Sequence, residues 1–304
     1  MADNYWINRN AEQQHIQDEI IRDKAYKEEL KRIYMNTYDS IDDELNREIT
    51  FLSNSDGVSY AEAKRTIKQF DVDRFKRTAK RMVEVKDFSP EANRRLRRYN
   101  VTMRTNRLEL MQAYINLNVA RLTDDEMGLI EKYLTDTAIN EMERQAGILG
   151  MTVPSPELLK RSVKAVLESD FQGAHFSDRL WNKSDAFNAD IEKAMRQVLI
   201  QGENPRVASR EIRKHVKDTV DRTTYVSERL AITESARVQT ATQRLSFEEY
   251  YIGKYVYIAE PTACKICGGL NGKVFNVADM HAGENAAPMH PFCKCSVAGR
   301  VERT

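Results

Sequence analysis

Apolar and polar residues follow the period of an α-helix along the first part of the chain. No glycine or proline interrupts this pattern before Gly57, so the residues predict one helix of about 40 residues. A helix of that length has a longer apolar face than a small domain buries, and we expect this face to meet a partner. The apolar positions at helical spacing are Ile16, Ile20, Leu30, Ile33, Tyr34, Ile41, Leu45 and Ile49.

Helix-start signals divide the chain into further helices up to residue 250. A Ser or Thr followed three residues later by Glu forms a capping box, and Ser-Pro places proline at the first helical position. These signals predict helices that open at Ser59, Ser89, Thr123 and Ser155. Apolar spacing predicts three more helices, at residues 185–200, 207–220 and 225–250.

The pattern changes to that of β-structure near Tyr255. Residues 255–258 are strand formers, Asn271-Gly272 is a favoured tight-turn pair, and residues 273–277 predict a returning strand. The protein is therefore expected to be mainly α, with long N-terminal helices and a C-terminal α+β module that carries a small β-hairpin. Because Gly173 breaks the helical pattern, we place the boundary between a helical region, 1–170, and this module, 171–304, near that residue.

All four cysteines lie in the C-terminal module, as Cys264-x-x-Cys267 and Cys293-x-Cys295, with His290 just upstream of the second pair. Thiolate and imidazole suit Zn²⁺, and a C-x-x-C turn directs two sulfurs to one centre. The residues predict a structural zinc site in a zinc-ribbon-like or knuckle-like hairpin, with five candidate ligands for four positions. Four reduced thiols packed in a small core are the alternative. Disulfides are less expected, because the sequence carries no secretory signal.

The net charge of +1 hides an uneven distribution. Residues 1–63 hold 7 Lys and Arg against 14 Asp and Glu, and residues 64–110 hold 15 against 6. This polarity favours either two partners of opposite sign or two solvated helical faces that neutralise each other.

An arginine-rich stretch lies within the basic segment. Consecutive arginines cover more than one helix face, so a single row of i,i+4 ion pairs does not satisfy them. Because Arg binds phosphates through two hydrogen bonds, we expect contact with double-stranded DNA, without base specificity, or with an acidic protein surface. The candidate contact residues are Arg94, Arg95, Arg97, Arg98, Arg104 and Arg107.

Several motifs in the last third of the chain occur in a characteristic order. They are Leu230 to Arg237, with Thr233-Glu234, then Tyr255 to Ala259, Cys264-x-x-Cys267, Leu270 to Phe275, and His290-Pro291-x-Cys293-x-Cys295. This series resembles the C-terminal module of the phage Mu F-like minor head proteins, which are head morphogenesis proteins of tailed phages. Upstream, Phe176 to Trp181 and Gln201 to Pro205 resemble the entry to that module.

The resemblance implies a minor structural protein of a tailed-phage head that acts in procapsid assembly. Its implied partners are the portal protein and possible scaffold or major capsid proteins, and its implied location is the virion, inside the head near the portal, after assembly in the host cytoplasm. Thr233-Glu234 is a hallmark of the family. We expect this pair either to brace the metal-bearing hairpin by hydrogen bonds or to be ordinary helix residues.

The main enzyme alternative is a zinc-supported nuclease that holds DNA on the arginine-rich helix and uses His290 as its base. The sequence contains no Gly-x-Ser-x-Gly elbow, Walker loop or dinucleotide fingerprint. No apolar run approaches the roughly 20 residues that cross a bilayer, so no membrane partner is expected. The assembly interpretation predicts that deletion of residues 1–60 abolishes incorporation into proheads and leaves the C-terminal module folded.

Overall fold

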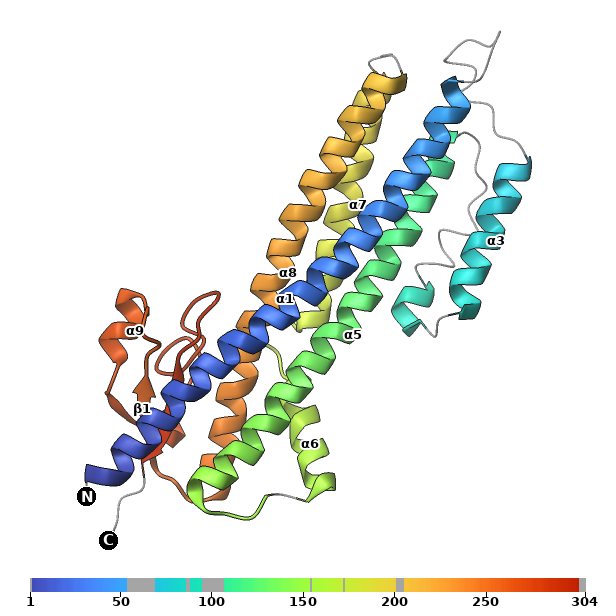
Figure 1. The fold of residues 1–304 in the computed structure, drawn as a ribbon. Helices are drawn as coiled ribbons and strands as arrows, with labels where there is room; N and C mark the ends of the chain where they lie inside the picture. Colours follow the sequence, from blue (N-terminus) through green and yellow to red (C-terminus); the bar gives the residue numbers. More distant parts are fainter. Residues whose placement is uncertain are drawn as a thin grey trace. The chain divides into compact units, whose positions relative to one another are not determined.

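The computed structural model describes residues 2–53, 69–85, 88–94, 107–153, 155–171, 173–200 and 205–300. Long helices make up most of this part of the chain, and a small sheet follows them near the C-terminus (Figure 1), which confirms the predicted fold class. The elements are α1 (Ala2–Ser53), α3 (Gln69–Val85), α5 (Arg107–Leu149), α6 (Pro156–Leu167), α7 (Phe176–Ile200), α8 (Pro205–Glu249), β1 (Lys254–Ile258), α9 (Lys265–Leu270), β2 (Val274–Asn276), the 3₁₀ helix η1 (Val277–Asp279) and β3 (Ser296–Arg300).

Two of the predicted helix starts are confirmed by their caps. The hydroxyl of Ser155 accepts a hydrogen bond from the backbone N–H of Leu158 at the start of α6. Ser89 accepts one from the N–H of Ala92, and residues 90–94 are helical. The long first helix is also confirmed and spans 52 residues. The predicted start at Ser59 lies outside the described residues.

Two predicted helix breaks are wrong. Thr123 lies inside α5, where its hydroxyl donates to the carbonyl of Val119 one turn back, so it does not cap a new helix. The helices predicted at 207–220 and 225–250 are parts of one continuous helix, α8, which spans Pro205–Glu249, because no proline or glycine lies between the two predicted pieces. A Thr-x-x-Glu pattern inside a helical apolar stripe therefore did not mark a helix start here.

The chain divides into two compact units, each built from separate segments. Unit 1 contains residues 1–29, 129–176 and 226–304, and unit 2 contains residues 30–128 and 177–225. Both units take residues from either side of position 170. These two units do not correspond to the regions 1–170 and 171–304 expected from the sequence. Whether those two regions are independent domains stays a prediction.

Unit 2 is helical, and its described core is apolar. Residues of α3, α5 and the short helix at 90–94 pack together, and Trp181 of α7 lies against them. A buried ion pair accompanies this core: Lys183 donates to Glu126 at 2.5 Å and to the hydroxyl of Tyr34 at 2.7 Å. Burial lowers the pKa of Lys183, and the charge of Glu126 opposes that shift. The core cluster consists of Phe75, Ala79, Phe88, Ala92, Leu110, Ala113, Tyr114, Leu117 and Ala120.

Unit 1 contains the sheet, whose strand order is β2-β1-β3 with both neighbours antiparallel to β1. The predicted hairpin is therefore confirmed, and β3 adds a third strand through the pairing of Ile258 with Ser296 and of Tyr255 with Gly299. Side chains of a strand alternate between its two faces. Because β1 is buried on both faces, its tyrosines and its aliphatic residues enter two different cores.

The aliphatic face of β1 packs against helix α1. Val256 and Ile258 form one buried cluster with Ile16, and Ile20 lies against it. Part of the long apolar face of α1 is therefore covered by the chain's own C-terminal module. This packing argues against the expectation that residues 1–60 can be removed without unfolding the module, because the deletion would expose this face of the sheet.

None of the helices in the described ranges combines the length and the apolar character of a membrane-spanning segment.

Candidate metal centre

The Cys-x-x-Cys pair lies in the connection between β1 and β2. Cys264 is the exposed residue that precedes α9, and Cys267 is buried in the first turn of that helix. The backbone N–H of Cys267 faces the sulfur of Cys264 and lowers the pKa of its thiol. The connection ends in a turn in which the N–H of Lys273 donates to the carbonyl of Leu270, and Gly272 within it has φ +80°. Backbone N–H groups directed at the first sulfur are typical of a knuckle.

The His-x-x-Cys segment forms a second tight turn. The N–H of Cys293 donates to the carbonyl of His290 at 3.1 Å, with Pro291 and Phe292 between them. Phe292 has φ +61°, and proline followed by a residue with positive φ defines a type II turn. Glycine is the usual residue at that position, so the turn holds Phe292 in a strained conformation. This turn places His290 and Cys293 on the same side as the first cysteine pair.

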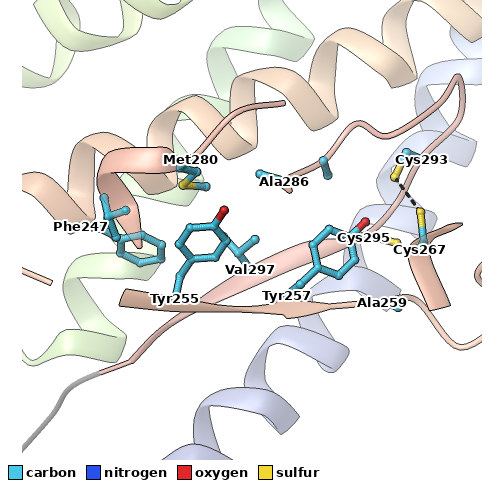
Figure 2. Packing of buried hydrophobic residues seen from close by; sticks show 12 residues of the cluster. Phe247, Tyr255, Tyr257, Ala259, Cys267, Met280, Ala286, Cys293, Cys295 and Val297 are labelled. Atoms are coloured by element: carbon cyan, nitrogen blue, oxygen red, sulfur yellow. Dashed lines mark hydrogen bonds between the residues drawn. The ribbon is translucent and has the colours of Figure 1, made fainter. Parts of the chain in front are cut away.

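The structure brings all five predicted ligands into two groups that share Cys267. Cys264, Cys267 and His290 form one group, and Cys267, Cys293 and Cys295 form the other, with ligand atoms within 4.8 Å of one another in each. The Cys267 sulfur lies 3.4 Å from Nε2 of His290. It lies 3.9 Å from the sulfur of Cys293, a contact that Figure 2 shows. The two turns therefore converge on one centre.

Two separations at Cys267 fit a tetrahedral zinc ion. With Zn–S near 2.3 Å and Zn–N near 2.0–2.1 Å, two ligand sulfurs lie about 3.8 Å apart and a sulfur and a nitrogen about 3.6 Å apart. The two observed separations at Cys267 are close to these values. The phenol of Tyr257 gives a second indication, because its buried hydroxyl finds no nitrogen or oxygen partner among the described residues. It points toward the sulfurs of Cys267 and Cys295 (Figure 2), where a thiolate would accept a hydrogen bond from it.

The thiols differ in acidity without a metal. A hydrogen bond from Cys295 lowers the pKa of Cys293 to about 5, and the same bond raises the pKa of Cys295. Burial raises the pKa of Cys267 to about 12. Metal binding at Cys267 would therefore release a proton, and affinity should fall as pH decreases.

Both ring nitrogens of His290 are engaged. Its Nδ1 lies 2.8 Å from the carbonyl oxygen of Pro291, a contact that raises the pKa of the imidazole, and its Nε2 faces Cys267. A general base needs a free nitrogen that reaches substrate. The arrangement favours a ligand over the base that the nuclease alternative requires.

Thr233 and Glu234 lie in the middle of α8 and make different contacts. The hydroxyl of Thr233 accepts a hydrogen bond from the N–H of Phe292 at 3.3 Å, in the strained turn. Glu234 pairs with Arg237 at 2.7 Å, and Arg237 donates to the end of α6 at the carbonyl of Val166. Thr233 is thus placed to brace the metal-bearing turn. The structural role of the pair stays a prediction.

The arginine-rich segment is described only in part. Arg94 is exposed and forms an ion pair with Glu91. Arg107 begins α5. The other four predicted contact residues, Arg95, Arg97, Arg98 and Arg104, lie outside the described residues.

Three residues near the centre were missed by sequence reasoning. The sequence identifies Tyr257 only as a strand former and assigns no role to Phe292 or Lys294. The alternation of β1 gave a usable signal for Tyr257, because Tyr255 and Tyr257 had to share one face. The partner of Lys294 lies on α1, and no local pattern indicates such a contact.

The fold and the site together define a helical protein with a Cys/His knuckle on a small antiparallel sheet. Residues 189–298 match the family described as Phage Mu protein F like protein. The match begins within α7 and ends in β3, so it includes all five candidate ligands. The match confirms, over these residues, the resemblance to the phage Mu F-like proteins that the sequence motifs indicate. No curated protein and no solved structure matches the chain.

Proposed function

We propose that the protein is a minor structural component of a tailed-phage head that acts with the portal protein, and with scaffold or major capsid protein, during procapsid assembly. The family match over residues 189–298 is the observation that carries this proposal. The site supports a structural role, because its two groups contain only cysteine and histidine, which suit a closed zinc site.

The proposed ligands are Cys264, Cys267, His290 and Cys293. This set joins the C-x-x-C turn to the H-x-x-C turn, and it includes the sulfur and the nitrogen that lie at tetrahedral separations from Cys267. A bound zinc ion would hold the two turns together and so stabilise the module. In this scheme Cys295 donates a hydrogen bond to Cys293, and Tyr257 donates one to a sulfur, so both support the ligands from outside the metal.

Proheads from the phage or prophage that encodes the chain test the assembly role. The tagged protein should copurify with proheads and with the portal protein, and cells that lack it should accumulate fewer DNA-filled heads. A Cys267→Ser variant should copurify less, whereas a Cys295→Ser variant should behave like the wild type. Normal yields of filled heads without the protein, together with its absence from proheads, would refute the assignment.

DNA contact is a separate proposal that rests on the arginines between residues 94 and 107. Filter binding with double-stranded DNA should show an affinity that falls steeply with salt, because binding to phosphates releases counterions. Replacing these arginines with glutamine should remove that binding. The same change at three exposed cations of α6, Lys160, Arg161 and Lys164, is the matched control and should have a smaller effect. An absence of binding at low salt would exclude DNA and favour an acidic protein partner.

A further inference from the structure

The segment that follows the H-x-x-C turn is tied to helix α1 by an ion pair. Lys294 stands between Cys293 and Cys295, and its ammonium group pairs with the carboxylate of Asp23. The Asp23 side chain is only 8% exposed and also accepts a hydrogen bond from the hydroxyl of Tyr133 on α5. A buried ion pair is sensitive to geometry, because displacement of one partner leaves the other charge without compensation.

A second polar contact lies two residues further along the chain. The hydroxyl of Ser296 donates to Glu12 of α1 at 2.7 Å and accepts from Gln239 and Gln243 of α8 at 3.0 and 2.9 Å. Glu12 is buried and also accepts from Arg144 at 2.7 Å. Burial raises the pKa of Glu12, and the positive charge of Arg144 opposes that shift. Ser296 therefore joins α1 and α8 at the first residue of β3.

The α1 residues in these contacts form one stripe. Glu12, Ile16, Ile20 and Asp23 recur at spacings of four, four and three residues, which places them on one helix face. The two outer residues bind the segment 294–296, and Ile16 and Ile20 cover the aliphatic face of β1 and β3. We call this face of α1, formed by these four residues, the clamp stripe.

We infer that metal binding at the Cys/His centre strengthens the docking of the clamp stripe on segment 294–296 and the sheet, and that loss of the metal loosens these contacts of α1. This inference rests on the proposed metal site. A ligand at Cys293 fixes the backbone immediately before Lys294, and with it the register of Lys294 and Ser296 against α1. By thermodynamic reciprocity, docking of the clamp stripe raises metal affinity by the same factor by which metal strengthens docking.

The consequence is a metal-dependent interaction surface. In the loaded protein the clamp stripe is covered by the sheet, by segment 294–296 and by α5, and is unavailable to other proteins. In the metal-free protein the stripe keeps its contacts with Arg144 and Tyr133 of α5, and its apolar residues and the aliphatic face of the sheet become accessible together. The centre thus controls how the first half of α1 is presented during assembly.

Hydrogen exchange of the full-length chain, loaded with zinc or stripped with a chelator, tests this inference. Zinc should slow amide exchange in residues 10–29 by about tenfold. Residues 30–47 of the same helix belong to unit 2 and should change little, so they serve as an internal reference. Equal exchange of residues 10–29 in both states would overturn the inference.

Two variants of α1 separate coupling from general loss of stability. Asp23→Asn removes the charge that pairs with Lys294 and keeps a group that accepts the Tyr133 hydroxyl, and it should weaken zinc affinity about tenfold in competition with a chromogenic chelator. Lys27→Gln is the matched control, because Lys27 pairs with Glu228 of α8 at 2.9 Å, away from the metal turn. It should leave zinc affinity unchanged.

The outcomes distinguish the two proposals. Wild-type zinc affinity in the Asp23→Asn variant would overturn the coupling alone, as would an equal loss in both variants. Failure of the reduced wild-type protein to bind zinc would overturn the metal site and the coupling with it.

Discussion

The two compact units differ in what holds them together. The described core of unit 2 is an apolar helix interface, to which Lys183 and Glu126 add one buried ion pair. Unit 1 instead buries three cysteines against a small sheet and joins α1 to that sheet through Glu12 and Asp23. The apolar periodicity of the sequence accounts for the helix packing of unit 2. The structure of unit 1 depends on contacts between residues far apart in the chain, and in our proposal also on a metal ion.

The largest expected effect is on unit 1 and comes from Cys267→Ser. Cys267 belongs to both ligand groups, so this change should remove stoichiometric zinc and lower the melting temperature by about 10 °C or more. Mass spectrometry measures the zinc content, and calorimetry measures the melting temperature. Cys295→Ser is the control and should retain the metal, because Cys295 stands outside the proposed ligand set and serine keeps a hydroxyl that donates to Cys293. Loss of zinc from both variants would contradict that set.

The next largest effect is on unit 2 and should not involve the metal. Lys183→Met leaves Glu126 buried without its ion-pair partner, and we expect a loss of about 4 kcal/mol in the free energy of unfolding. Lys193 is exposed on the same helix, and Lys193→Met should change stability by less than about 0.5 kcal/mol. Denaturant unfolding gives both values. A change in zinc content of the Lys183 variant would show that the two units do not differ as described.

A smaller effect tests the apolar part of the clamp stripe. Ile16 is 1% exposed, and Ile16→Ala should lower the free energy of unfolding by about 3 kcal/mol through lost burial and a cavity. Ile21 of the same helix is 65% exposed, so the same change there should have an effect of less than about 0.5 kcal/mol. Similar values at both positions would mean that α1 does not cover the sheet.

The smallest effect concerns the strained turn. Phe292 has a positive φ that glycine adopts without strain, so Phe292→Gly should be more stable than Phe292→Ala by about 1 kcal/mol. Using alanine as the reference separates the conformational term from loss of the phenyl ring. Equal stability, or a more stable alanine variant, would contradict the type II turn.

Local sequence patterns were sufficient for much of the fold. The apolar spacing of α1, the Ser155 cap and the strand-forming run in β1 each predicted an observed element. The same kind of reasoning failed at Thr123, because a buried threonine that bonds back to Val119 has the same sequence pattern as a cap. Local patterns identify possible hydrogen bonds, and packing decides which of them form.

The residues of the candidate site could be predicted from the sequence, but their arrangement in space could be predicted only in part. Ligand chemistry and spacing identified all five residues that the structure brings together. The central position of Cys267 and the donor at Tyr257 depend on how β1 and two turns meet in space. The ion pair of Lys294 with Asp23 joins residues that are 271 positions apart, and many acidic residues were equally plausible partners.

The Cys/His centre of unit 1 is proposed to hold a structural metal ion. Native mass spectrometry of the full-length protein, purified under reducing conditions and supplied with zinc, tests it most directly. We expect one zinc ion per chain, released by a chelator with a loss of thermal stability. A protein that binds no zinc, and has the same melting temperature with and without it, would contradict the claim.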